Sequence, residues 1–224
     1  MTNLMSFAKR FKHRAYVALP SLLAVSALFL SLESSESRAQ PADGTQTLVF
    51  LRHAEKPEGG LGQLNCQGLN RAIDLSTLLP EKFGKADYVF AANPTRNVEE
   101  GELDNSYSYI RPLMTISPAA IKLGLPVNIE FSANDTSDLA RELLSEKYHN
   151  STIYTAWSHG YLPDQINKVA GNAVGERQKI TDDWAGDDFD SLYVLTLKWH
   201  NGKASLQSRS YKQGLDNGKD TCPT

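Results

Sequence analysis

Short apolar runs alternate with amphipathic segments along most of the chain. The runs predict strands, at residues 47–51, 86–92, 127–130, 152–157, 191–199 and 206–211. Apolar positions with helical spacing predict helices, at residues 69–79, 110–123 and 139–144. Pro80 is expected to follow the end of the first helix and Gly124 the end of the second. Because strands that alternate with helices form layered folds, we predict an α/β protein with a mainly parallel sheet.

The first residues have the pattern of an export signal. Basic residues between Lys9 and Arg14 precede an apolar stretch at 15–32, and Ser37-Arg38-Ala39 fits the rule of small residues before a cleavage site. We therefore predict a signal peptide at 1–39, a single domain at 40–224, and a periplasmic or secreted protein. The apolar stretch is also long enough for an uncleaved anchor, and only in that case is a membrane partner expected.

Charge and cysteine content narrow the function classes further. Residues 40–224 hold 18 basic and 24 acidic residues, a formal net charge of −6, which argues against a nucleic-acid partner. Cys66 and Cys222 permit a disulfide in an oxidising compartment, and two free thiols are the alternative. No ligand spacing supports a zinc site, so we expect neither a metal nor another cofactor. The sequence gives no prediction of oligomeric state.

Two histidines follow predicted strands directly. Arg52-His53 comes after the run at 47–51, and Ser158-His159-Gly160 comes after the run at 152–157. Ligands bind at the carboxyl ends of strands in open α/β sheets, so the two histidines can converge on one crevice. A neutral imidazole can attack phosphorus while an adjacent guanidinium holds the phosphoryl oxygens. His149 and His200 lack this context and are predicted to be solvated surface residues.

Four segments together resemble the histidine phosphatase superfamily, also called phosphoglycerate-mutase-like. They are Leu51–Pro57, Leu64–Ala72, Arg111–Thr115 and Trp157–Gly160, in the order that the family has. The resemblance runs from about Thr47 to Tyr193, and it implies an exported bacterial member with a three-layer α/β/α sandwich. It further implies that His53 is phosphorylated transiently, and that Arg52, Arg111 and His159 surround the phosphoryl group.

The chain departs from the family pattern between the second predicted strand and Arg111. An acidic insertion at 95–106 lies where the family has a short connection, and it leaves Arg96 as a competitor for the role of Arg111. The family branch with Ser-His-Gly takes its leaving-group proton from an acid that follows the arginine helix. Glu130 is the best positional candidate for that acid, with Asp135 and Asp188 as alternatives.

The resemblance implies an exported histidine acid phosphatase-type phosphomonoesterase that uses a phosphohistidine intermediate. Its partner would be a small phosphorylated substrate, and a cell-envelope sugar phosphate is one candidate. The alternative is a catalytically weak relative that binds phosphorylated or anionic envelope ligands, or a partner protein, without turnover.

Overall fold

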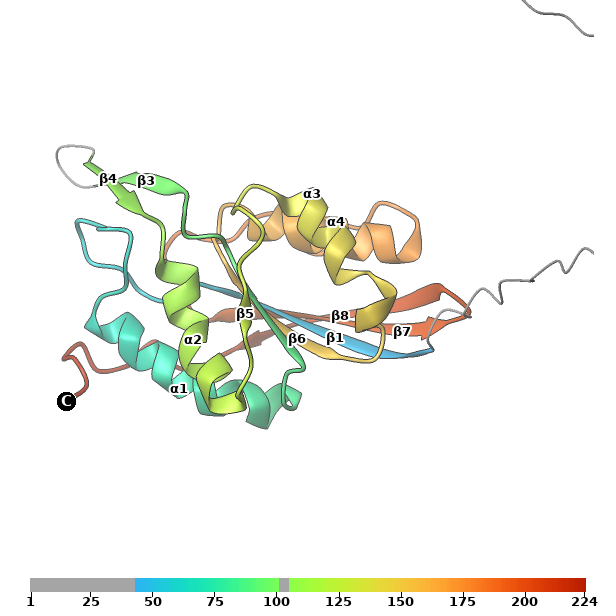
Figure 1. Ribbon diagram of the computed structural model, residues 1–224, viewed down its shortest axis with the longest axis horizontal. Helices are drawn as coiled ribbons and strands as arrows, with labels where there is room; N and C mark the ends of the chain where they lie inside the picture. Colours follow the sequence, from blue (N-terminus) through green and yellow to red (C-terminus); the bar gives the residue numbers. More distant parts are fainter. Residues whose placement is uncertain (1–42, 101–104) are drawn as a thin grey trace, which may run out of the picture. The chain divides into compact units, whose positions relative to one another are not determined.

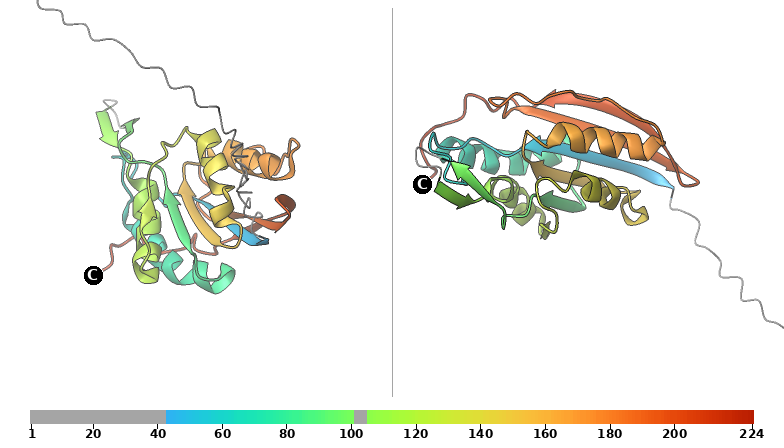
Figure 2. Two further views of the ribbon diagram at one scale, coloured as in Figure 1. Left: turned by 45° about the vertical axis from the view of Figure 1, so that its right-hand side comes forward. Right: turned by 90° about the horizontal axis from the view of Figure 1, so that it is seen from above.

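A six-stranded sheet forms the centre of the computed structural model, which describes residues 43–100 and 105–224. Its strands are β1 (Gly44–Arg52), β2 (Tyr88–Ala91), β5 (Val127–Asn128), β6 (Thr152–Trp157), β7 (Ser191–His200) and β8 (Lys203–Lys212). The spatial order is β5-β2-β6-β1-β7-β8. The first four strands in this order are parallel, and the β7–β8 hairpin continues the sheet in antiparallel fashion (Figure 2). The predicted signal peptide at 1–39 lies outside the described residues.

Helices cover both faces of the sheet (Figure 1). They are α1 (Cys66–Phe83), α2 (Arg111–Leu123), α3 (Thr136–Leu143) and α4 (Leu162–Val174), with a short 3-10 helix, η1 (Glu146–Tyr148). The pair α3 and α4 packs on one face, and the pair α1 and α2 packs on the other. The predicted α/β fold, with three layers and a mainly parallel sheet, is confirmed.

The uninterrupted apolar character of β1 follows from this layering. Leu48 and Phe50 point into the core under α3 and α4, whereas Val49 and Leu51 point into the core under α1 and α2. All four side chains are fully buried. A strand that is covered on both faces needs apolar residues at successive positions, and β1 therefore lacks the alternation of a half-exposed strand.

The first helix ends later than its sequence predicts. Pro80 lies inside α1, which continues to Phe83 before Gly84 ends it. The proline ring removes one backbone donor, but Leu79 remains fully buried on the sheet and Phe83 packs edge-on against Tyr211 at 5.3 Å. Tertiary packing of this face outweighs the local cost of the proline. Gly124, by contrast, ends α2 as predicted, in the left-handed conformation that glycine favours.

The acidic insertion forms a small hairpin that stands off the main sheet (Figure 1). Its strands are β3 (Asn97–Glu100) and β4 (Asn105–Ser108), which pair antiparallel. Tyr109 and Ile110 then lead directly into α2. The hairpin therefore begins near the end of β2 and returns the chain to the start of the helix that carries Arg111.

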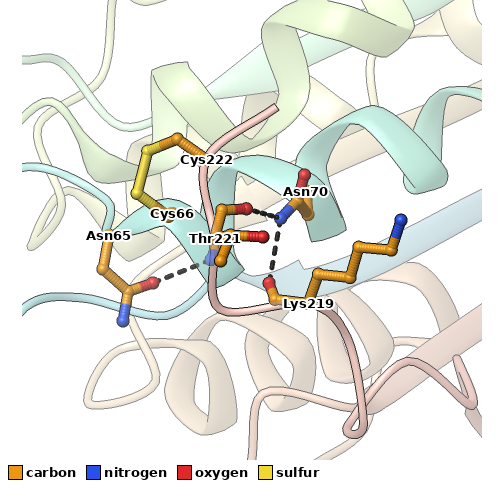
Figure 3. The surroundings of a disulfide bond; sticks show 7 residues. Asn65, Cys66, Asn70, Lys219, Thr221 and Cys222 are labelled. Carbon is orange, nitrogen blue, oxygen red and sulfur yellow. Dashed lines mark hydrogen bonds between the residues drawn. A yellow bond between two sulfur atoms is a disulfide. The ribbon is translucent and has the colours of Figure 1, made fainter. Parts of the chain in front are cut away.

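A disulfide joins Cys66, the first residue of α1, to Cys222 in the C-terminal tail (Figure 3). The Asn70 side-chain amide donates to the backbone carbonyls of Lys219 and Thr221, at 2.9 and 2.8 Å, and holds the tail beside the bond. The alternative of two free thiols is wrong. A disulfide of this kind indicates a non-reducing environment.

One predicted surface histidine is buried. His149 is 3% exposed and its ring stacks on that of Trp199, with centroids 3.7 Å apart. Trp199 is 50 residues away in the sequence, so the residues around His149 give no sign of this contact. The prediction that His149 lies on the surface is therefore wrong. His200 is exposed as predicted and bonds to Asp43. Within residues 43–100 and 105–224, no helix combines the length and apolar character needed to cross a membrane.

Candidate active site

His53 and His159 lie at the ends of neighbouring parallel strands. Arg52, the last residue of β1, is in register with Trp157, the last residue of β6, and the backbone amide of His53 donates to the Trp157 carbonyl at 2.9 Å. His159 follows two residues after β6. The two histidines are 106 positions apart in the sequence, yet the pairing of β1 with β6 brings them to one edge of the sheet.

The His53 imidazole is held in one tautomer. Its Nδ1 lies 2.8 Å from the carbonyl oxygen of Ala54, and because a carbonyl only accepts, Nδ1 carries the proton and Nε2 keeps a lone pair. Burial lowers the pKa of His53 well below its usual range, and the positive charges of Arg111 and Arg52 lower it further. His53 is therefore a neutral imidazole with Nε2 available as a nucleophile.

A buried threonine connects the loop after His53 to the start of α2. The backbone amide of Ala54 donates to the Thr115 hydroxyl oxygen at 2.8 Å, and that hydroxyl donates to the Arg111 carbonyl at 2.9 Å. The same residue, Ala54, supplies the carbonyl that orients His53. The nucleophile and the first residue of α2 are thus fixed relative to each other through two hydrogen bonds.

Arg52 is 2% exposed and is held by the loop that precedes β7. Its Nη1 donates weakly to the carbonyls of Ala185 and Asp188, at 3.4 and 3.3 Å, and its guanidinium carbon lies 3.8 Å from the centre of the Phe189 ring. Burial lowers the pKa of Arg52 to about 10, which still leaves it charged at neutral pH. Its Nε is buried without a hydrogen-bond partner among the described residues.

Arg111 is 4% exposed and forms a bidentate ion pair with Glu100 of β3. Its Nη1 and Nη2 each donate to one carboxylate oxygen at 2.8 Å. Its Nε, like that of Arg52, is buried and has no partner in the described part of the chain. The competitor Arg96 is exposed, and its Nη1 donates to the Tyr161 hydroxyl at 3.0 Å.

Arg52 and Arg111 share one feature, a buried Nε. Protein acceptors hold Nη1 of Arg52 and both Nη atoms of Arg111, while Nε of each is a buried donor without a partner within residues 43–100 and 105–224. Each guanidinium packs on an aromatic ring that also lies beside the His53 imidazole: Phe189 for Arg52 and Tyr109 for Arg111. Both positive charges lower the pKa of His53. Unpaired buried donors are costly, and a guanidinium edge that holds such a donor matches the oxygens of a phosphoryl group. The site is therefore suited to an oxyanion beside His53.

Two further groups, besides Arg111, interact with the Glu100 carboxylate. The backbone amide of Gly62 donates to it at 3.0 Å, and Lys56 lies 3.4 Å from it. A side chain at Gly60 would come within 2.2 Å of the carboxylate, so this loop is shaped around Glu100. Burial raises the pKa of Glu100, but hydrogen bonds from Arg111 and Gly62 lower it to about 2 overall. The glycine-rich loop thus approaches an internal carboxylate.

Because of the ion pair between Glu100 and Arg111, we expect the free energy of unfolding to depend on pH. The folded-state pKa of Glu100 is below its usual value of 4.5, so its ionised form stabilises the fold above pH 4.5, and this contribution is lost as the pH falls towards 2. We expect Glu100→Gln to lower the free energy of unfolding by about 1–3 kcal/mol at neutral pH. Denaturant unfolding from about pH 7 down to 3 should show this difference shrinking.

The exposed neighbour Glu99 is the matched control on the same strand. Glu99→Gln should change the free energy of unfolding little, because surface substitutions have small effects. A constant difference between wild type and Glu100→Gln across that pH range would contradict the role of the ionised carboxylate.

His159 is partly buried, and its Nδ1 is among the buried atoms that lack a partner in the described chain. Burial lowers the pKa of His159, and the positive charges of Arg52 and Lys56 act in the same direction. Asp183 opposes them. In the ligand-free protein His159 is thus a neutral side chain at pH 7.

The candidate proton donors lie in different surroundings. Glu130 is exposed just beyond β5, which β2 and β6 separate from β1 in the sheet. It lines a cavity of about 410 Å³ together with Tyr88 and Tyr148. The Asp135 carboxylate accepts from the Ser132 amide at 2.9 Å. The structure does not bring Glu130 to the other four predicted residues, and its role stays a prediction.

The Asp188 carboxylate is fully engaged at the start of β7. It accepts from the amide and hydroxyl of Ser191, at 2.9 and 2.5 Å, and from Lys212 at 3.2 Å. Burial raises its pKa, but these hydrogen bonds lower it overall, so Asp188 is ionised at neutral pH. Its contribution to the site is the backbone carbonyl that accepts from Arg52.

Sequence reasoning missed three residues that contact the site. Glu100 binds Arg111, Phe189 lies under the Arg52 guanidinium, and Tyr109 packs edge-on against the His53 ring with centroids 5.9 Å apart. Glu100 lies in the acidic insertion and Phe189 follows the alternative acid Asp188, but the sequence predicted no contact for either residue. Tyr109, two residues before Arg111, carried no signal.

A second buried cluster stabilises the loop after His53. Glu55 forms hydrogen bonds with Arg71 of α1 at 2.6 and 2.9 Å. Arg71 also donates to Asp190 at 3.2 Å and to Asp216 at 3.0 Å. This cluster joins the loop, the start of β7 and the tail that the disulfide holds. Among residues 43–100 and 105–224, no three His, Cys, Asp or Glu side chains are grouped to hold a metal ion.

Solved structures with a similar fold include phosphatases. A candidate phosphohistidine phosphatase, SixA from Nakamurella multipartitia, is 16% identical with a TM-score of 0.46, over 75% of this chain and 97% of that chain. A phosphoserine phosphatase from Entamoeba histolytica is 12% identical with a TM-score of 0.45, over 76% and 98%. A mycobacterial glucosyl-3-phosphoglycerate phosphatase is 12% identical with a TM-score of 0.46, over 73% and 95%.

These structures belong to the histidine phosphatase superfamily, which the sequence motifs resemble. Searches with the sequence found no matching family model and no significant match among curated proteins. Because the TM-scores are below 0.5, we infer function from the residues of the site alone.

Proposed function

We propose that this chain is an exported phosphomonoesterase that hydrolyses a phosphate ester through a phosphohistidine intermediate on His53. One observation carries the proposal: a buried, neutral imidazole with a free Nε2 lies beside two buried guanidiniums whose Nε donors lack partners in the described part of the chain. A nucleophile without charge and donors that match phosphoryl oxygens are the two components that transfer of a phosphoryl group requires.

The reaction would take two steps. In the first, Nε2 of His53 attacks phosphorus, the N–P bond forms, the P–O ester bond breaks, and the leaving oxygen takes a proton. In the second, water attacks phosphorus and gives a proton to the group that protonated the leaving oxygen, the P–N bond breaks, and inorganic phosphate leaves. Arg52 and Arg111 would offset the charge on the non-bridging oxygens in both steps.

His159 would change its protonation when the substrate binds. The pKa of His159 is lowered in the free protein by burial and by nearby positive charge. A phosphoryl dianion adds negative charge at the site, which favours the protonated imidazole. Protonated His159 would then be a further donor to the phosphoryl group.

Glu130 stays the sequence-based candidate for the proton donor to the leaving group. If it acts so in the substrate complex, Glu130→Gln slows alkyl phosphates far more than aryl phosphates, because an aryl oxide leaves without a proton. The measurement is the ratio of kcat/KM for the two substrate types. A uniform loss would indicate a positioning role, and no loss would move the role to Asp135, to Asp188 or to a group on the substrate.

Export and the substrate class belong to the same proposal. The predicted signal peptide supports passage out of the cytoplasm, and the disulfide is compatible with that destination. The substrate would be a small phosphorylated molecule, with a cell-envelope sugar phosphate as one candidate.

Incubation with a panel of sugar, alkyl and aryl phosphates, in the presence of a chelator, tests the proposal. We expect the purified protein to release inorganic phosphate without added metal. The alternative is a protein that binds phosphorylated ligands without turnover, and the exposed, separate position of Glu130 favours it. No turnover across the panel, together with binding of inorganic phosphate, would support that alternative.

A further inference from the structure

Tyr109 carries a buried hydroxyl that has no role in the two steps above. The residue lies between β4 and α2 and is 3% exposed. Its hydroxyl oxygen is among the buried atoms without a hydrogen bond of acceptable geometry in the described part of the chain. Proteins usually satisfy buried hydroxyls, since each unsatisfied one costs stability. This hydroxyl therefore needs a functional explanation.

The surroundings of Tyr109 are those of the candidate active site. Its ring is perpendicular to the His53 imidazole, at 84° and with centroids 5.9 Å apart. The Arg111 guanidinium carbon lies 4.8 Å from the centre of the same ring. The side chain is thus packed against the nucleophile on one side and against an oxyanion-binding arginine on another.

The polar neighbours of the hydroxyl are two guanidiniums and one other hydroxyl. Arg111 and Arg52 are near enough to favour the ionised form of Tyr109, and neither guanidinium can accept its proton. The Ser158 hydroxyl, next to His159, is the one neighbour that could accept, but no hydrogen bond of acceptable geometry joins it to Tyr109 among the described residues. Burial still raises the pKa of Tyr109, so the hydroxyl keeps its proton at neutral pH and is a donor. An oxyanion among these groups would supply the acceptor.

We propose that the Tyr109 hydroxyl donates a hydrogen bond to a non-bridging oxygen of the phosphoryl group while that group is transferred to and from His53. The inference rests on the proposed function. No proton leaves the tyrosine in either step, so Tyr109 stabilises charge and is separate from the proton donor to the leaving group. One donor of this kind is worth about 10²-fold to 10³-fold in rate.

Tyr109→Phe tests the assignment, because it removes the hydroxyl and keeps the ring against His53 and Arg111. We expect kcat/KM to fall about 10²-fold for aryl and alkyl phosphates alike. Inorganic phosphate should also raise the melting temperature of this variant less than that of wild type. Without phosphate, the melting temperature should stay the same or rise, since the change deletes an unsatisfied buried hydroxyl.

Tyr154 of β6 provides the matched control. It is fully buried, and its hydroxyl donates to the Gly84 carbonyl, away from the site. Tyr154→Phe should keep kcat/KM and lower the melting temperature by about 2–4 °C, the effect of one lost hydrogen bond in a domain of this size. The two variants should therefore change activity and stability in opposite ways.

The outcomes separate this inference from the proposed function. If wild type turns over substrate and Tyr109→Phe equals it in turnover and in phosphate binding, the inference fails and the proposed function stands. A loss of activity that accompanies a lower melting temperature would make Tyr109 structural, and a loss confined to alkyl phosphates would make it the proton donor; either result overturns the assignment. If wild type neither turns over the panel nor binds phosphate, both proposals fail.

Discussion

Replacing His53 by alanine is expected to abolish turnover and covalent labelling by a phosphoryl donor. The substitution removes Nε2, the atom that would bond to phosphorus. Loss of a nucleophile typically lowers kcat by 10⁴-fold or more. Steady-state turnover and acid-labile phosphoryl label on the protein are the two measurements.

Two other histidines provide the comparison. His200→Ala should leave turnover and labelling unchanged, because His200 is exposed at the end of β7, far from the carboxyl end of β1. His159→Ala should slow turnover, yet it should still allow labelling, since the nucleophile remains. Acid-labile label retained in His53→Ala would assign the nucleophile to another residue.

Arg111→Ala is expected to lower kcat/KM by at least 10²-fold to 10³-fold, whereas Arg96→Ala should change it only a few-fold. Arg111 is buried near His53, and its Nε has no partner among the described residues, whereas Arg96 is exposed and bonds to Tyr161. The measurement is kcat/KM with an aryl phosphate, together with competitive inhibition by inorganic phosphate. Equal losses, or a greater loss with Arg96→Ala, would show that the second oxyanion-binding arginine is placed wrongly.

Stability must be separated from catalysis in this experiment. Arg111→Ala leaves Glu100 without its principal partner, and removal of one member of a largely buried pair can cost about 3–5 kcal/mol. The double variant Arg111→Ala/Glu100→Gln removes the unpaired charge. We expect it to recover part of the free energy of unfolding without recovering activity, which would assign the catalytic loss to the missing guanidinium.

Local patterns in the sequence predicted most of the framework. The apolar run at 152–157 predicted β6 with the bounds that the structure has, and helical spacing up to Gly124 predicted α2. Side-chain periodicity and a glycine that favours positive φ are properties of a few consecutive residues, so they can be recognised without knowledge of distant contacts. The placement of His53 and His159 at strand ends followed from the same patterns.

Pro80 shows a limit of prediction from local sequence, because the helix continues past it. A proline predicts a helix end because of its own ring and missing donor, but Leu79 and Phe83 on either side of it pack against other parts of the fold. The energy of that packing comes from residues far away in the sequence. A short stretch of sequence around Pro80 therefore cannot reveal this packing energy.

The chemistry of the site depends on distances between strands, helices and loops. These distances cannot be read from the order of residues in the sequence. Sequence by itself determined which residue types are present: two histidines and an arginine at strand ends, and an acidic insertion before Arg111. Only the tertiary structure decided that Glu100 from that insertion pairs with Arg111, and that Tyr109 packs against His53. Hydrogen bonds and ion pairs act over about 3 Å, so they are set by how the hairpin, the sheet and α2 pack together.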